Sequence, residues 1–137
     1  LEKITKKLNL NNIVEFVGKI SNKNVKKYFQ KSKILIVPSI WPENSPISIY
    51  ESMSFGRPVI GSNIGGIPDL IDNTKTGYLI KPKNSKEISK KIIKLLSNDY
   101  LLEKMCKKSR IRAENLFSID NHINKLIKIY EKAINIK

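Results

Sequence analysis

The sequence predicts a single α/β domain in which helices pack on both faces of a parallel sheet. Short runs of apolar, β-branched residues alternate along the chain with longer stretches whose apolar residues recur at helical spacing. Such alternation returns each strand to the sheet in the same direction, which is typical of a three-layer arrangement. The length of 137 residues and the 40% hydrophobic content suit one domain with its own core.

The expected elements follow one another in a regular order. The predicted strands cover residues 14–18, 34–38, 58–62 and 77–80. The predicted helices cover residues 1–9, 22–31, 46–55, 85–97, 99–115 and 119–135, with a short helical turn near 67–72. The apolar residues of the last helix fall on one stripe, so we expect that helix to expose an apolar face.

The central unit is a strand, a loop, a helix and a second strand over residues 34–62. Its first strand is a short apolar run that ends at Pro38, which is typical of a buried parallel strand. Ser45 suits the N-cap of the helix, and Pro46 suits its first position, where a missing N–H costs nothing. Gly56 then closes the helix about three turns later.

Two carboxylates bracket the start of the central helix. Glu43 falls in the loop at the carboxyl end of the sheet, where open α/β sheets bind ligands. Glu51 lies roughly 7.5 Å along the helix axis from Pro46, so the two side chains can meet different parts of an extended ligand. The free N–H groups at the helix start offer donors to hydroxyl or phosphate oxygens. Ionised carboxylates accept hydrogen bonds from vicinal hydroxyls, so the arrangement is typical of a sugar-nucleotide site.

The spacing of these carboxylates is weak evidence alone, because 12 acidic residues give roughly one such pair by chance. The ordered motifs around the pair are far more specific. They resemble the C-terminal domain of retaining nucleotide-sugar glycosyltransferases of family 4, the "glycosyl transferases group 1" type with the GT-B fold. Besides the two glutamates, the matching motifs are Val14-Glu15-Phe16-Val17-Gly18, Pro38-Ser39, Gly56-Arg57-Pro58-Val59-Ile60, Gly65-Gly66-Ile67-Pro68-Asp69 and Gly77-Tyr78-Leu79-Ile80.

This resemblance implies a Rossmann-like domain with a donor site on these motifs. By similarity, Glu51 holds the ribose hydroxyls, and Glu43 positions the donor sugar rather than acting as a covalent nucleophile. Backbone N–H groups after Ser45 hold the sugar and diphosphate, and the loop 18–20 faces the base. The expected donor-binding residues besides Glu43 are Glu51, Ser45, Ile47, Ser48, Gly18, Lys19, Ile20 and Ser39. The resemblance implies no metal and no cofactor, because the nucleotide sugar is the substrate.

Two departures from the family pattern qualify this assignment. The family commonly has Glu after the Gly-Gly turn, where this chain has Asp69, one methylene shorter. The Arg and Lys that neutralise the donor diphosphate lie, in the family, upstream of anything in this chain. We therefore expect residues 1–137 to be a nucleotide-sugar-binding C-terminal domain that lacks its own start and the N-terminal acceptor domain. Little or no turnover is expected from this chain alone.

Several residues have competing interpretations. Gly65-Gly66 permits close approach of the backbone to a ligand, which we favour over a role in the turn alone. Trp41 is either an aromatic wall of the sugar pocket or a residue that packs the loop onto the sheet. Arg57 stands at the far end of the central helix from the ligand, which favours a surface role over a phosphate contact. The lone Cys106 cannot form an internal disulfide, which agrees with a reducing cytosol.

The formal net charge of +14 raises the alternative of a basic binding module. Residues 1–80 hold 11 basic and 6 acidic side chains and residues 81–137 hold 15 and 6, so the excess is spread out. The lysines of residues 85–97 fall on the solvated face of an amphipathic helix, and no aromatic residues interleave them. The chain is rich in Lys, Ile and Asn, as genome base composition can dictate. This is a simpler explanation of the charge than a specific anionic partner. Among functional uses, we favour peripheral contact with an acidic membrane over nucleic acid.

Three functional hypotheses remain. The first is the donor-binding half of a retaining glycosyltransferase that moves a sugar from a nucleoside diphosphate to a glycan or lipid-linked acceptor, as in polysaccharide biosynthesis. The second is a sugar phosphorylase or synthase of the same fold. The third is a non-catalytic basic module for nucleic acid or membrane, with structural carboxylates. The first predicts a cytoplasmic protein, alone or peripheral to the inner face of the membrane, with an acceptor that the missing N-terminal domain contacts.

Overall fold

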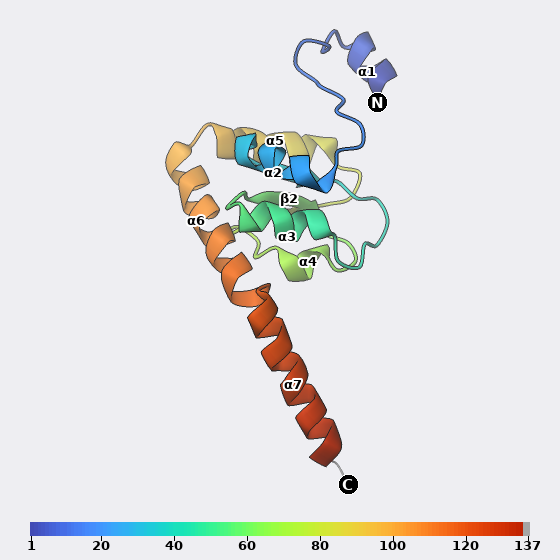
Figure 1. Cartoon of the computed structure of the whole chain (residues 1–137). Helices are drawn as coiled ribbons and strands as arrows, with labels where there is room; N and C mark the ends of the chain where they lie inside the picture. The colour runs from blue at the N-terminus through green and yellow to red at the C-terminus, as the bar shows by residue number, and fades with distance from the viewer. Residues whose placement is uncertain (136–137) are drawn as a thin grey trace.

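A computed structural model describes residues 1–135, in which seven helices accompany three strands (Figure 1). The strands are β1 (Leu35–Val37), β2 (Val59–Ser62) and β3 (Gly77–Ile80). The helices are α1 (Glu2–Lys7), α2 (Asn22–Lys31), α3 (Ile47–Ser54), α4 (Ile67–Leu70), α5 (Ser85–Leu96), α6 (Asp99–Leu116) and α7 (Ile119–Asn135). The predicted alternation of strand and helix is confirmed from β1 onward.

The sheet is parallel and has the order β1-β2-β3. Leu35 pairs with Val59, and Val59 pairs with Gly77, so the three strands run in register from one edge to the other. A turn closes the outer edge of β3, because Asn73 accepts a hydrogen bond from the Leu79 N–H through Oδ1 at 3.1 Å. Parallel pairing places the carboxyl ends of β1 and β2 side by side, which fixes where their loops meet.

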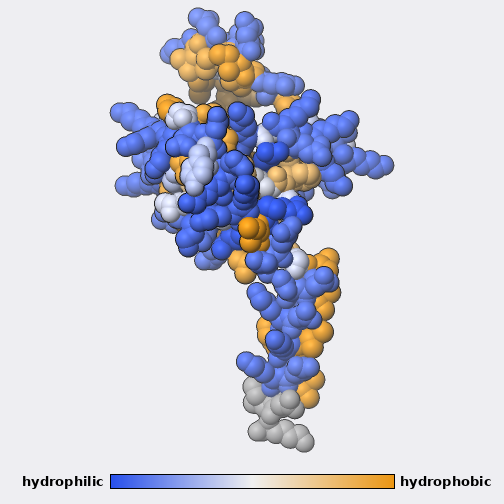
Figure 2. Space-filling view, turned by 90° about the vertical axis from the view of Figure 1, so that its left-hand side faces the viewer, coloured by the Kyte–Doolittle hydropathy of each residue, from blue (hydrophilic) through white to orange (hydrophobic). Residues whose placement is uncertain are grey.

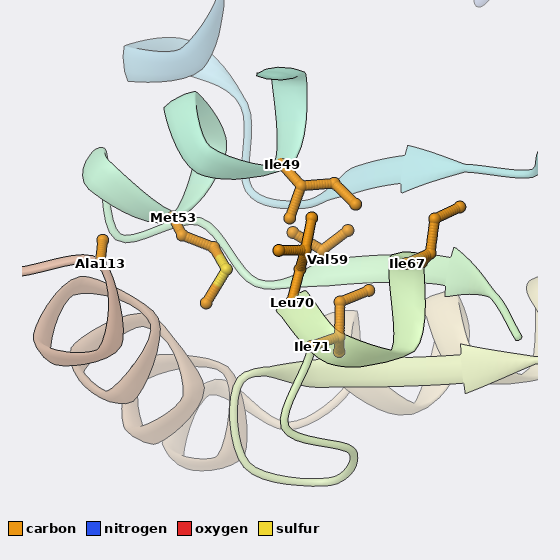
Figure 3. Packing of buried hydrophobic residues seen from close by; sticks show 7 residues of the cluster. All are labelled: Ile49, Met53, Val59, Ile67, Leu70, Ile71 and Ala113. Carbon is orange, nitrogen blue, oxygen red and sulfur yellow. The ribbon is translucent and has the colours of Figure 1, made fainter. Parts of the chain in front are cut away.

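Two hydrophobic clusters cover the two faces of the sheet. On one face, side chains of α3 and α4 pack on β2 around Val59 (Figure 3). On the other face, Ile60 and β3 pack against α5 and the first half of α6. Successive residues of a strand point to opposite faces, so neighbouring positions of β2 supply both clusters. Helix α6 joins the layers, because Met105 belongs to the second cluster and Ala113 to the first. The three-layer prediction is therefore confirmed.

Three arginines cap the carboxyl ends of helices by donating hydrogen bonds to backbone carbonyls that lack helical partners. Arg57 donates through Nε to the Phe29 carbonyl at 3.0 Å, and through Nη2 to that of Gln30 at 2.9 Å, at the end of α2. Arg112 donates through Nε to the last carbonyl of α4 at 2.8 Å. Arg110 donates through Nη1 to the last carbonyl of α3. The surface role expected for Arg57 is thus a helix-capping role.

The predicted strand at residues 14–18 is wrong. This segment is irregular, and Val14, Phe16 and Val17 are each more than a third exposed. A strand needs a neighbouring backbone to satisfy its N–H and C=O groups, and no described residue pairs with this segment. Glu15 of this segment and Ile34, just before β1, instead line a cavity of about 1030 Å³. The apolar pattern is present, but the segment has no strand beside it.

The last helix, α7, runs on from α6 and away from the sheet (Figure 1). Its apolar side chains follow one side of the helix, as predicted (Figure 2). Exposed members of this stripe are Ile119, Ile123, Leu126, Ile127, Tyr130 and Ile134. Within residues 1–135, no helix combines the length and apolar character that crossing a bilayer requires.

Two buried serines give a test of hydrogen bonding in the core. Ser62 Oγ is buried without a partner at the end of β2, whereas Ser109 Oγ donates to the Thr76 carbonyl at 3.0 Å. We expect Ser62→Ala to leave the free energy of unfolding unchanged or to raise it by up to about 1 kcal/mol. We expect Ser109→Ala to lower it by about 1 kcal/mol. Urea unfolding followed by circular dichroism measures both, and equal losses in the two variants would contradict this account.

The half-buried Cys106 gives a pH test of the same core. Burial raises the pKa of the Cys106 thiol, against the opposing effect of the Arg57 guanidinium nearby. The folded chain therefore holds this proton more tightly than the unfolded chain, so the thiol's contribution to stability is lost as pH rises above the unfolded pKa of about 8.5. The difference in free energy of unfolding between the wild-type chain and Cys106→Ala should shrink steadily over the alkaline range above about pH 8.5. A difference that stays constant over that range would refute the assignment.

Candidate functional site

The candidate site lies at the carboxyl edge of the sheet, where the loops after β1 and β2 meet. The first loop, residues 38–46, carries Glu43, and the second, residues 63–66, ends in two glycines. The Gly66 N–H donates a hydrogen bond to the Glu43 carbonyl oxygen at 2.7 Å. Segments more than twenty residues apart in sequence are thereby joined at the point where an open α/β sheet binds its ligand.

The two glycines are required by the neighbouring protein backbone. Gly65 has φ of +58°, and a Cβ there would overlap the Glu43 carbonyl oxygen. A Cβ at Gly66 would overlap the Asn44 carbonyl oxygen. We expected this pair to permit the approach of a ligand; among the described residues, the segment that approaches it is the loop carrying Glu43.

The Glu43 side chain is half-buried and held by a serine. Ser39 Oγ donates to Glu43 Oε1 at 2.9 Å. Ser39 follows β1 by two residues, so a short loop brings the two side chains together. We predicted that Ser39 contacts the donor, but its hydroxyl proton is engaged by Glu43.

The start of α3 differs from the prediction by one residue. The helix begins at Ile47, and Pro46, whose ψ of 114° is extended, occupies the N-cap position instead of the first helical position. Ser45 Oγ does not cap the helix and lies 2.5 Å from Tyr50 Oη. No described residue accepts a hydrogen bond from the N–H of Ile47 or Ser48. These two donors, at the positive end of the helix dipole, match the expected binding positions.

Glu51 occupies the exposed outer face of α3. It lines a cavity of about 330 Å³ together with Tyr50, Arg110 and Phe117. The rings of Tyr50 and Phe117 meet edge to face, with centroids 4.6 Å apart. Glu51 thus lies beside an aromatic wall, whereas Glu43 sits within the loop network.

The loop predicted to face the base, residues 18–20, leads into α2. Gly18 has φ of +67°, which favours glycine, and Lys19 and Ile20 line a cavity of about 390 Å³ at the start of α2. Tyr28 also lines this cavity. None of the residues around it lines the cavity beside Glu51. Hydrogen bonds and close backbone contacts thus join Ser39, Glu43 and the glycine pair, and Lys19 and Ile20 line a separate cavity.

Sequence reasoning missed the role of Tyr50 at this site. A tyrosine in the second turn of a helix carries no signal that its hydroxyl meets a serine five residues earlier. Trp41, which we expected either to wall the pocket or to pack the loop, is 61% exposed, so it does not fasten the loop to the sheet. Residues 1–135 contain no group of three or more His, Cys, Asp or Glu side chains placed to hold a metal ion.

Known proteins resemble this chain over most of its length. A profile of the family "Glycosyl transferases group 1" matches residues 1–113. Spore coat protein SA of Bacillus subtilis (strain 168) is 33% identical over 120 residues, which are 87% of this chain and 32% of that protein. The chain therefore spans about a third of the length of this relative.

Solved structures agree with this relationship. Sucrose-phosphate synthase from Thermosynechococcus elongatus matches with a TM-score of 0.87 at 25% identity, over 99% of this chain and 34% of the other. A mutant of Staphylococcus aureus TarM, in complex with fondaparinux, α-GlcNAc-glycerol and UDP, matches with a TM-score of 0.81 at 26% identity, over 94% of this chain and 26% of the other. The matched part lies in the C-terminal half of glycosyltransferases with the GT-B fold. Its sequence motifs, its parallel sheet and the profile match together establish that this chain belongs to the glycosyl transferases group 1 family.

Proposed function

We propose that this chain binds the nucleoside-diphosphate sugar of a retaining glycosyltransferase, which transfers the sugar to a glycan or lipid-linked acceptor. The observation that carries the proposal is the Glu43 carboxylate, oriented by Ser39, in the loop that leads to the unpaired N–H groups of Ile47 and Ser48. A fixed carboxylate accepts hydrogen bonds from sugar hydroxyls, and N–H groups at a helix start donate to phosphate oxygens.

Each carboxylate has a distinct role in this proposal. Glu43 positions the donor sugar without becoming covalently bound to it, and Glu51 accepts hydrogen bonds from the ribose hydroxyls. Family membership and the UDP held by the related TarM structure support a nucleoside diphosphate as the ligand. The loop of Gly18, Lys19 and Ile20 is the proposed contact for the base, and its cavity at the start of α2 offers the room.

We also propose a domain assignment, which the match to about a third of the length of known relatives supports. Residues 1–137 serve as the donor-binding domain, and the acceptor is bound by a part of the enzyme that this chain does not contain. Turnover by the isolated chain is accordingly expected to be very low. A cytoplasmic location is proposed because the single Cys106 suits a reducing compartment.

A sugar synthase of the same fold is the second candidate function. The likeness to sucrose-phosphate synthase, at 25% identity over nearly the whole chain, favours it specifically. Both candidates use a nucleotide-sugar donor and the same donor contacts. They differ in the acceptor and in the product, which is sucrose phosphate in that synthase and a glycosylated glycan or lipid in the first candidate.

Glu51→Gln tests the donor site directly. Ligand-observed NMR of the wild-type chain against UDP, GDP, ADP, dTDP and their common sugar conjugates should detect one preferred nucleotide. The Gln side chain accepts hydrogen bonds less strongly than a carboxylate, so affinity should fall roughly tenfold. Glu103→Gln, on the exposed face of α6, removes the same charge far from the loops and should bind as the wild type does. Equal affinity in wild type and Glu51→Gln would contradict the assignment of Glu51.

We further propose peripheral contact with an acidic membrane through the corner between α5 and α6. Ile93, Leu96 and Tyr100 are 63%, 47% and 75% exposed there, and Lys90 and Lys104 flank them. Apolar side chains among lysines suit an anionic bilayer surface, and the net charge of +14 attracts the chain to it.

Vesicle sedimentation tests this surface. Each lysine near an anionic leaflet contributes about 1 kcal/mol, so reversing two of them by Lys90→Glu and Lys104→Glu should weaken binding to phosphatidylglycerol vesicles at least tenfold, that is roughly 1.4 kcal/mol. The control is Lys3→Glu with Lys6→Glu in α1, which gives the same net charge and should bind more strongly than the first variant. Equal loss in both variants would mean that overall charge, and no particular surface, drives binding. Tight, salt-sensitive binding to RNA without vesicle binding would favour a nucleic-acid module instead.

A further inference from the structure

The main chain and the side chain of Glu43 are each held from the end of a different strand. Ser39, just after β1, donates to Oε1 at 2.9 Å. Gly66, just after β2, donates its N–H to the Glu43 carbonyl oxygen at 2.7 Å. Because the two strands are hydrogen-bonded neighbours, both contacts rest on one rigid pair of strands.

The glycine pair leaves this loop no room to shift. A side chain at Gly65 would overlap the Glu43 main chain, and one at Gly66 would overlap the next carbonyl. Two backbone segments in such close contact fix the path of the loop, because atoms at van der Waals distance tolerate little displacement. The Cα of Glu43 is therefore set by the second strand, and its carboxylate by the first.

The two oxygens of the carboxylate are not equivalent in this arrangement. Oε1 accepts the Ser39 proton, and no side chain or backbone group among residues 1–135 donates to Oε2. A carboxylate so oriented keeps one oxygen for a ligand hydroxyl. Prior fixation of the side chain also reduces the rotational freedom that a ligand has to freeze when it binds.

We infer that Ser39 and the Gly65–Gly66 turn form a clamp that positions Glu43, so that its Oε2 alone receives a hydroxyl of the donor sugar. This inference rests on the proposed function. Ser39 is then a positioning residue that acts through Glu43 and makes no contact with the donor. The clamp serves recognition of the sugar and leaves recognition of the nucleotide to other residues.

The test compares two ligands on the 137-residue chain. Affinities for UDP-glucose and UDP, or for the GDP, ADP or dTDP pair if the chain selects that base, are measured by ligand-observed NMR. The ratio of the affinity for the sugar conjugate to the affinity for the nucleotide alone measures the contribution of the sugar to binding. Ser39→Ala should lower this ratio roughly tenfold, with affinity for the nucleotide alone unchanged. Ser39→Thr keeps the hydroxyl and should restore the ratio, which a purely structural role of Ser39 does not predict.

A matched pair of glycine variants tests the other half of the clamp. Gly65→Ala and Gly56→Ala both place alanine at positive φ, so both carry a similar backbone cost. Only Gly65 faces Glu43, since Gly56 faces α6 at the other end of α3. Both variants should lower the melting temperature, but Gly65→Ala alone should remove the preference for the sugar conjugate.

The outcomes separate this inference from the proposed function. If Glu43→Gln abolishes the preference for UDP-glucose while Ser39→Ala retains it, the clamp is overturned and the donor site stands. If the wild-type chain binds no nucleotide and no nucleotide sugar, the proposed function is overturned for this chain. Amide hydrogen exchange without ligand tests the clamp by itself: the Gly66 N–H should be protected in the wild type and exposed in Gly65→Ala. Rapid exchange in the wild type would refute the clamp.

Discussion

The parallel pairing of β1 with β2 is the constraint on which the candidate site depends. Val37 stands opposite Gly61, so the chain leaves both strands at the same height on the same edge of the sheet. The loops that follow are packed so closely that a side chain at Gly65 or Gly66 would overlap the first loop, so both positions require glycine. The direction in which the first loop then enters α3 is fixed by the contact between Glu43 and Gly66. Sheet geometry thus determines the positions of the carboxylate and of the helix start.

The best-packed part of the chain is the part that carries this site. Side chains of β2 are almost completely buried, as are the residues of α3 and α4 that face it, and α6 contributes to both core clusters. Arginine side chains donate hydrogen bonds to carbonyl groups at the carboxyl ends of α2, α3 and α4. In contrast, α7 exposes a continuous apolar stripe, and the segment 14–17 has no strand partner. A binding site on the packed elements is held to a narrower range of geometries than one on the exposed segments.

Sequence patterns predicted the elements whose formation depends on nearby residues. They failed for elements and contacts that depend on residues distant in sequence. The bounds of α2 and of β3 and the start of α7 were predicted to the residue, because helical periodicity and a short apolar run suffice for them. Residues 14–18 have an equally good strand pattern, but a strand exists only beside another strand. The Ser45 cap failed because the hydroxyl of Tyr50 competes for the same side chain. The loop contact of Gly65 could not be predicted because Glu43 lies twenty-two residues earlier, with α3 and β2 between the two residues.

The two glutamates of the motif illustrate how one sequence pattern supplies two kinds of carboxylate. Glu43 is half-buried, and Ser39 sets its rotamer. The entropy cost of ordering this side chain therefore arises on folding and not on ligand binding. Glu51 is exposed on α3, so a ligand has to order its side chain on binding. A fixed group discriminates between hydroxyl positions because it does not follow the ligand, whereas a flexible group adapts to several. In the proposed site, the position that faces the donor sugar therefore suits the held carboxylate Glu43, and the position that faces the ribose suits the flexible Glu51.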